Sequence, residues 1–172
     1  MNPSVLQNIQ PTGVASIDEQ HRTLFELAHR ATDDQAEQLG ADWFRRALDA
    51  FADYVQYHFT AEEHFMLRIG FSEFETHRTW HDQFRLEICD LVDAARFATV
   101  TRGIRLQLAH TVETGFVEHI LTADRRLAEH ASLSLPPDRL HLADSITLRK
   151  AGFLVAEVEE ELAPTGSFPS GT

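Results

Sequence analysis

Apolar side chains recur every three or four residues along four long stretches of the chain, and this period is typical of amphipathic helices. The first stretch begins at Ser16 and fades before Gly40, the second covers about residues 42–69, the third begins near Ser72, and the fourth covers about residues 104–130. Strand patterns are nearly absent. Because short connections join these long helices, we predict an all-α fold, an antiparallel up-down four-helix bundle.

Local signals predict where two of these helices begin and one ends. The spacing Ser-x-x-Glu, found at Ser16 and Glu19 and again at Ser72 and Glu75, is that of a capping box at a helix N-terminus. Gly70 follows the last apolar residue of the second stretch, so we expect it to end that helix.

An additional C-terminal helix is predicted after the bundle. Pro136-Pro137 interrupts the chain, and a short apolar stripe with 3-4-3-4 spacing then lies within about residues 138–162, at Leu148, Ala151, Val155, Val158 and Leu162. This helix packs on the bundle, pairs with a second chain in a homodimer, or leads to an output domain, and the first alternative is favoured. We therefore divide the chain into a bundle domain at 12–131, a linker with the amphipathic helix at 132–163, and a disordered tail at 164–172.

Composition narrows the classes of partner. The chain has 27 acidic and 15 basic residues and a formal net charge of −12, which argues against nucleic-acid binding. Its one cysteine, Cys89, cannot form an internal disulfide. No apolar run approaches the ~20 residues that a membrane crossing requires, and the N-terminus lacks the features of a signal peptide. We expect a cytoplasmic protein without membrane insertion.

Five histidines and one glutamate interrupt the apolar stripes of the four helices: His21, His58, Glu62, His77, His81 and His119. Burying such groups without partners costs several kcal/mol. A single inward histidine is more often a hydrogen-bonded core residue than a ligand, but the convergence of six side chains favours a metal centre. The i, i+4 spacing within helices two and three places each pair of side chains on one helix face. The other histidines are predicted to be surface residues: His29, His64, His110, His130 and His141.

These residues resemble the motifs of the hemerythrin family, and most closely those of its bacterial branch. The matching segments are Ile17-Asp18-Glu19-Gln20-His21, then His58-Phe59-Thr60-Ala61-Glu62-Glu63 with Met66 and Gly70-Phe71, then His77 with His81 and Phe84, and His119-Ile120 with Asp124. The resemblance covers about residues 12–131 and fills all seven positions that carry iron ligands in the family.

The resemblance implies a non-haem di-iron centre with two iron ions. Its ligands here would be His21, His58, Glu62, His77, His81, His119 and Asp124. In the family the five histidines divide three and two between the irons, and the two carboxylates, here Glu62 and Asp124, bridge them together with an oxo or hydroxo group. One iron keeps an open position, where O2 binds, as do small anions such as azide.

The spacing of one expected ligand gives it little support. Asp124 follows His119 by five residues, which is about 140° around an ideal helix, so the two need not share a face. The alternative is a surface carboxylate paired with Arg125 or Arg126. Only the family resemblance assigns Asp124 to the metal.

The expected O2 pocket departs from the family. Where the family commonly has Trp-Leu, four and three residues before the histidine of the fourth helix, this chain has Gly115-Phe116. We expect Phe116 to form the roof of the pocket, with Gly115, Phe59 and Ile120 also lining it. The alternatives are simple drift in core packing, or a Phe116 ring that tips into the space of the missing indole.

The function predicted from these residues is reversible O2 binding, for carriage, storage or sensing. A histidine-rich, carboxylate-poor centre favours binding of O2 over its activation, and no residue is assigned a catalytic role. A di-iron oxidase or peroxidase is the alternative from the enzyme class, and a redox or iron sensor that signals through the C-terminal helix is a third. A zinc hydrolase is remote because the HExxH motif is absent.

Overall fold

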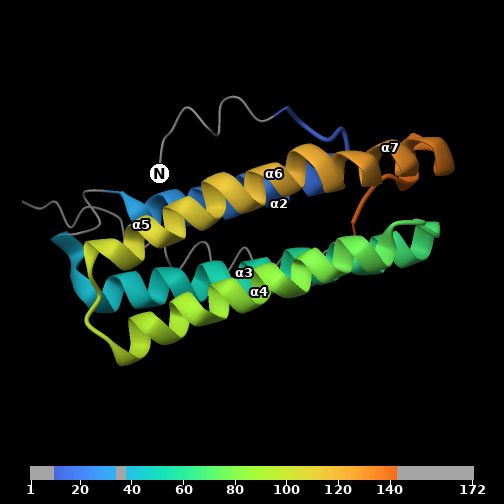
Figure 1. The fold of residues 1–172 in the computed structure, drawn as a ribbon. Coiled ribbons are helices and arrows are strands. Elements are labelled where there is room, and N and C mark those ends of the chain that lie inside the picture. Colours follow the sequence, from blue (N-terminus) through green and yellow to red (C-terminus); the bar gives the residue numbers. More distant parts are fainter. Residues whose placement is uncertain (1–9, 34–37, 143–172) are drawn as a thin grey trace, which may run out of the picture.

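Four helical rods lie side by side in the computed structural model, which describes residues 10–33 and 38–142 (Figure 1). The first three rods are α2 (Ala15–Thr32), α3 (Gly40–Ile69) and α4 (Phe74–Phe97). The fourth runs without a break through α5 (Arg102–His110), the π-helix η2 (Thr111–Phe116), α6 (Val117–His119), the π-helix η3 (Ile120–Asp124) and α7 (Arg125–Ser134). The predicted all-α fold with four helices is confirmed.

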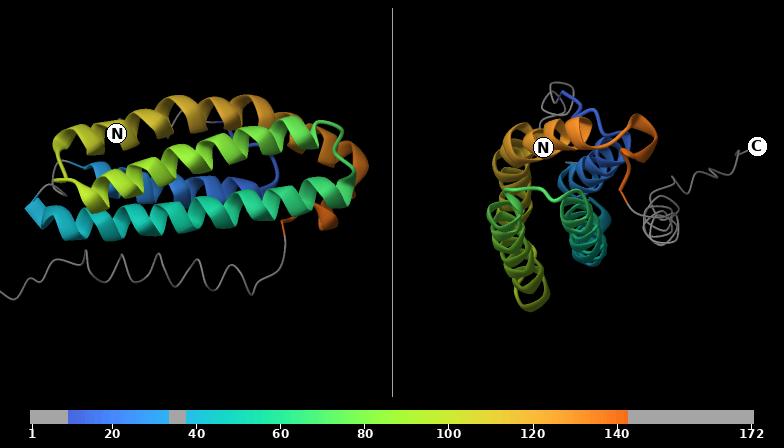
Figure 2. Two further views of the ribbon diagram at one scale, coloured as in Figure 1. Left: turned by 60° about the horizontal axis from the view of Figure 1, so that its bottom comes forward. Right: turned by 90° about the vertical axis from the view of Figure 1, so that its right-hand side faces the viewer.

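The rods enclose a common core, as the end-on view in Figure 2 shows. Rod α2 packs against α3 and α5, and α4 likewise packs against α3 and α5, while α7 at the end of the fourth rod also contacts α3. Short turns join α3 to α4 and α4 to the fourth rod, and the chain reverses direction at each of these two turns (Figure 1).

The core consists of two apolar clusters with a layer of polar side chains between them. The larger cluster includes Phe44, Phe51, Phe84 and Phe116, and the smaller one includes Phe65. The seven predicted ligands lie where the two clusters meet. On α3, Phe59 belongs to the larger cluster and Ala61 to the smaller one, and on the fourth rod Ile120 belongs to the larger cluster and Leu127 to the smaller one.

The helix ends differ in part from the sequence prediction. Gly70 ends α3 with a left-handed φ of 66°, as expected. The two capping boxes are not formed, because α2 begins after Val14 and α4 after Glu73, each without a side-chain cap. Ser16 instead accepts a hydrogen bond from the backbone N–H of Leu142, at 2.8 Å.

The chain folds back across one end of the bundle after the fourth rod. The 3-10 turn η4 (Pro137–Arg139) follows α7, and Leu142 is buried in the smaller cluster. Residues 138–142 contain the end of this turn and no α-helix, while the rest of the predicted C-terminal helix and the predicted tail lie outside the described residues. No helix in the described ranges is both long and apolar enough to cross a membrane.

Candidate metal centre

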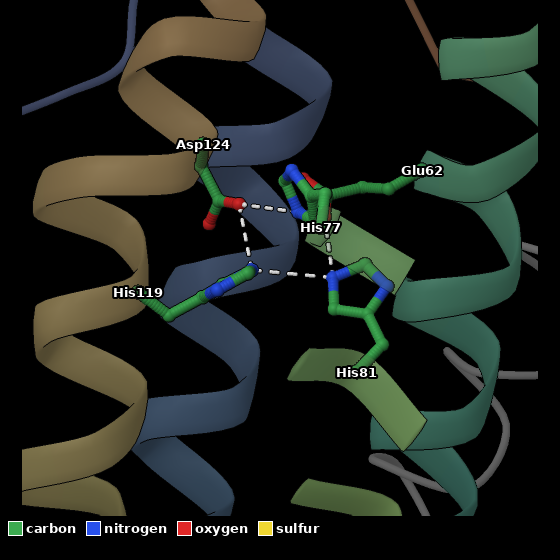
Figure 3. Close-up of side chains that lie close together, drawn as sticks. All are labelled: Glu62, His77, His81, His119 and Asp124. Carbon is green, nitrogen blue, oxygen red and sulfur yellow. Dashed lines mark hydrogen bonds and ion pairs between the residues drawn. The ribbon is translucent and has the colours of Figure 1, made fainter. Parts of the chain in front are cut away.

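The structure brings all seven predicted ligands to one place in the core. Each side chain belongs to a residue that is at most 4% exposed: His21 on α2, His58 and Glu62 on α3, His77 and His81 on α4, His119 on α6 and Asp124 on η3. Figure 3 shows five of them, which point toward one another from three different rods. The i, i+4 pairs on α3 and α4 share a helix face, as their spacing predicts.

The ligand atoms form two groups that share both carboxylates. One group contains Glu62, His77, His81, His119 and Asp124, and the other contains His21, His58, Glu62 and Asp124. Within each group the candidate ligand atoms lie within 4.8 Å of one another. The centre therefore has a three-histidine group and a two-histidine group, and Glu62 and Asp124 lie at their boundary.

The two oxygens of Asp124 face different groups. Oδ1 lies 2.9 Å from Nε2 of His119 and 3.2 Å from Nε2 of His77, whereas Oδ2 lies 3.1 Å from Nε2 of His21. A carboxylate held in this way has one oxygen for each of two cations. Asp124 therefore lies at the boundary between the two groups, and the alternative of a surface carboxylate is wrong because the residue is fully buried.

Glu62 lies on the other side of the same boundary. Its Oε2 is 3.4 Å from Nε2 of His81, 3.7 Å from that of His77 and 3.9 Å from that of His58. It therefore approaches histidines of both groups, although through one oxygen only.

A π-helical turn explains why Asp124 faces inward despite its unfavourable spacing. The segment Ile120–Asp124 forms i→i+5 hydrogen bonds, and the wider turn holds more residues than an α-helical turn. The residue five positions after His119 therefore lies above it instead of about 140° away around the helix. The backbone, and not the residue spacing, brings Asp124 into the centre.

Many polar atoms of the centre have no hydrogen-bond partner among the described residues. They are Nε2 of His21 and of His58, both ring nitrogens of His77, and both oxygens of Glu62 and of Asp124. The imidazole–carboxylate contacts are short, but they lack the alignment of hydrogen bonds. Buried polar groups are almost always partnered. Nitrogen and oxygen lone pairs that converge without such partners are what a metal ion requires, and the two groups of ligand atoms fit two metal ions.

Burial and charge set the protonation states of these groups. Burial lowers the pKa of His58 to about 3, so this imidazole is neutral at pH 7. Burial alone would also lower the pKa of His77, but the close carboxylates of Asp124 and Glu62 and their negative charges raise it to about 9. Burial and mutual repulsion oppose ionisation of the two carboxyl groups, yet the surrounding histidines hold both pKa values below their usual range.

Two of the histidines are oriented by side chains that the sequence analysis missed. Nδ1 of His58 lies 2.9 Å from Oε1 of Gln20, whose Nε2 donates to the hydroxyl of Tyr57 at 3.1 Å. Nδ1 of His81 lies 3.0 Å from Oε1 of Glu63. Such partners fix the tautomer that leaves Nε2 free for a metal. Gln20 and Glu63 each stand next to a ligand in the sequence, which is a signal too common to have singled them out.

Arg85 holds Glu63 in turn. Its NH1 lies 2.9 Å from Oε1 of Glu63, and its guanidinium lies 5.3 Å from the centre of the Phe59 ring. Hydrogen bonds to His81 and to Arg85, together with the arginine charge, outweigh burial and lower the pKa of Glu63. The partner of His81 is therefore an ionised carboxylate, whereas the partner of His58 is a neutral amide.

The predicted pocket residues lie around the centre in different places. Phe116 contacts the edges of His21 and His58, with ring centres 5.6 and 5.9 Å apart, so it lies beside the two-histidine group. Phe59 is stacked on His81 at 3.9 Å and therefore lies beside the three-histidine group. Ile120 is buried in the larger cluster.

Gly115 lies beside Phe84 of α4. A β-carbon at this position would stand 3.7 Å from the Phe84 ring, so Phe84 occupies the space beside it. Trp80, which the sequence analysis did not single out, is stacked on Phe84 at 5.0 Å and on His119 at 3.7 Å. An indole thus lies beside the centre, but α4 supplies it.

The five remaining histidines lie outside the centre. His64, His110 and His141 are exposed, while His29 and His130 are half-buried.

Comparison with known proteins identifies the family of this fold. Residues 12–131 match the model of the hemerythrin HHE cation binding domain. The chain belongs to the hemerythrin family.

Two curated relatives agree with this membership. This hemerythrin-family chain is 31% identical over 116 residues to a bacteriohemerythrin of Clostridium acetobutylicum. The aligned residues cover 66% of this chain and 89% of that protein. The chain is also 29% identical over 114 residues to a bacteriohemerythrin of Methylococcus capsulatus. That alignment covers 66% of this chain and 85% of that protein. No solved structure matches the chain significantly.

Proposed function

We propose that the chain binds two iron ions, one at each histidine group, and that it binds O2 reversibly at this pair. The observation that carries the proposal is the sharing of Glu62 and Asp124 by a group of three histidines and a group of two. Iron in the ferrous state, when bound, supplies the electrons that O2 takes up on binding.

The residues divide between the two ions in a simple way. His77, His81 and His119 would hold one ion, His21 and His58 would hold the other, and Glu62 and Asp124 would bridge them. The two-histidine group offers one protein ligand fewer, so its ion has the position for an external ligand. Phe116 lies against both of these histidines, and O2 or azide would therefore bind beneath its ring.

The surroundings of the centre favour binding over oxidation of a substrate. The ligand set is rich in neutral imidazoles, and it places fewer negative charges on the metals than the carboxylate-rich sites of ferritin-like oxidases do. Apolar rings lie along the inner side of the two-histidine group, where Phe116 contacts both histidines and Phe84 lies 5.8 Å from Phe116. Such an environment excludes water and slows loss of the electrons to solvent.

Anaerobic loading of the protein with ferrous iron tests this proposal. Elemental analysis should give two irons per chain, and one metal per chain or none would contradict the assignment. The loaded protein should then change colour reversibly through repeated cycles of O2 and vacuum. Steady consumption of O2 with an added substrate would instead support a di-iron oxidase.

Metal removal provides a second, independent test. Because the orphaned polar atoms gain partners only when metal is bound, binding energy should appear as folding stability. The loaded protein should be more stable than the metal-free protein by several kcal/mol. Thermal denaturation followed by circular dichroism measures the difference, and equal melting temperatures would contradict the reasoning.

A further inference from the structure

Two surface cavities reach the proposed centre. One, of about 190 Å³, lies between α4 and the fourth rod, and both His77 and His119 line it. The other, of about 210 Å³, lies along α2, and His21 is the only proposed ligand among its lining residues. We refer to them as the α4 cavity and the α2 cavity. The α4 cavity thus touches two ligands of the three-histidine group.

His77 forms part of the wall between the α4 cavity and the centre. Its Nε2 faces the centre, 3.2 Å from Oδ1 of Asp124. Nδ1 has no hydrogen-bond partner among the described residues, although His77 is only 3% exposed. This histidine therefore offers one ring nitrogen to the centre, and its side chain also lines the cavity.

Carboxylates line the outer part of the α4 cavity. Glu73 and Glu118 are both exposed there, together with Arg126. Arg126 lies 3.0 Å from Oε2 of Glu73, so their charges are paired. Glu118 forms no ion pair within the part of the chain that the structure describes, and its charge is available to attract a cation.

Trp80 lines the cavity beside His119. Its indole is stacked on His119 with ring centres 3.7 Å apart and planes 12° from parallel. The residue is half-buried, so one part of the ring lies against the ligand and another part reaches the surface. The ring therefore shields one face of the His119 imidazole, and a cation that moves between the cavity and the centre passes beside it.

We propose that the α4 cavity is the route by which divalent metal ions reach and leave the centre. On this route Glu118 attracts the cation, His77 and His119 form the wall between the cavity and the centre, and Trp80 forms the movable cover. The inference rests on the function proposed above, since it requires a metal at the three-histidine group.

A cover and a positioning residue have different kinetic signatures. A cover raises the barrier without changing the end states, so its removal speeds uptake and release by the same factor and leaves the dissociation constant unchanged. If Trp80 only positioned the imidazole of His119, its removal would speed release alone and weaken binding.

The experiment compares Trp80→Ala with Phe25→Ala, using Co²⁺ and the metal-free full-length protein. Phe25 lines the α2 cavity and is a matched loss of one aromatic ring. Uptake is followed by stopped-flow absorbance of bound Co²⁺, and release by transfer to excess chelator. We expect Trp80→Ala to speed both rates at least several-fold, with a dissociation constant unchanged within twofold, and Phe25→Ala to change neither rate.

Each other outcome overturns the proposal. Faster exchange only in Phe25→Ala would assign the route to the α2 cavity, and faster exchange in both variants or in neither would exclude a single route at Trp80. Faster release alone would make Trp80 a positioning residue. A wild-type protein that binds fewer than two Co²⁺ per chain would instead reject the proposed function, before any rate is compared.

Glu118→Gln provides a test that does not disturb the core. Removing one exposed charge from the cavity should slow Co²⁺ uptake about two- to fourfold at low salt, and the difference should disappear at high salt because exposed charges are screened. The matched control is Glu26→Gln, which removes an exposed charge from the α2 cavity. Equal effects of the two substitutions, or no effect of Glu118→Gln, would contradict the route.

Discussion

Replacing Phe116 by alanine tests whether its ring covers the site where O2 is proposed to bind. The residue is 1% exposed. Its ring lies against His21 and His58, and both imidazoles meet it at 87°, edge to face. It also contacts Phe25 and Phe84. The ring therefore has neighbours both in the two-histidine group and in the apolar cluster, and its loss should affect binding as well as stability.

The loss of stability can be estimated from this environment. Truncation of a fully buried phenylalanine costs about 3–5 kcal/mol, and most of this cost is the cavity that remains. Rings on several sides of Phe116 limit collapse, so we expect a value in the upper half of that range. For a chain of this size, 1 kcal/mol corresponds to about 2–4 °C in melting temperature, and the decrease should be roughly 8–20 °C.

The binding effect is measured on the diferric protein with azide. If the ring covers the ligand position, Phe116→Ala should bind azide faster and should autoxidise faster after exposure to O2. Phe44→Ala is the matched control, because Phe44 is fully buried and lies under the guanidinium of Arg105, which is 4.4 Å from its ring centre. This variant should lose similar stability without any change in the rate of azide binding. Azide rates in Phe116→Ala equal to those of the wild type would refute the covering role.

Three further substitutions or titrations test other parts of the site. Glu63→Gln should lower metal affinity about 10–100-fold, because His81 loses a charged outer partner. Competition with a chelator measures this, and Glu87→Gln, which removes an exposed charge elsewhere on α4, should leave affinity unchanged. Burial raises the pKa of Tyr54 from 10.0 to about 12, so its phenolate absorbance should appear near pH 12. The contribution of neutral Tyr54 to the free energy of unfolding is fully present below pH 10 and should be lost as the pH rises from 10 toward 12. Gly115→Ala should raise the melting temperature, since alanine is favoured by up to about 1 kcal/mol in helices and its β-carbon would be in ordinary contact at 3.7 Å from the nearest ring.

The part of the centre that could be predicted from the sequence is the part in which residues follow α-helical spacing. His58 and Glu62, like His77 and His81, stand one turn apart on stripes that are otherwise apolar. A polar residue at a core position is an exception that needs a partner, so the pattern alone identified six inward-facing groups. The pattern succeeded because α2, α3 and α4 are regular α-helices at the positions of these ligands.

The outer partners could not be predicted, because they depend on contacts between rods. Gln20 reaches His58 across 38 positions of sequence, and Glu63 reaches His81 across 18. The stacking of Trp80 on His119 likewise joins α4 to the fourth rod. Sequence periodicity places a side chain on a helix face, but it does not fix the height of one helix against its neighbour.

The capping boxes failed for a related reason. Ser16 and Ser72 have the spacing of helix caps, yet packing against the returning chain gives Ser16 a different partner. The backbone N–H of Leu142 donates to its hydroxyl, and burial of Leu142 in the smaller cluster holds that contact. Tertiary burial of one apolar side chain thus outweighs a local signal of about 1 kcal/mol.

The fourth rod shows what the centre requires of the backbone. A regular α-helix through residues 116–124 would place Phe116 and His119 on one face and turn Asp124 about 140° away from His119.

Among the described rods, only this one contains π-helical turns, and they end at Phe116 and at Asp124. Both residues contact His21. The departures from α-helical geometry therefore occur at the residues that complete the two-histidine group, where a regular helix would have left one carboxylate outside the core. Such turns are rare and less favourable than α-helical ones, and they are frequent at functional sites. Their position brings Asp124 to the boundary of both histidine groups and Phe116 against the two-histidine group.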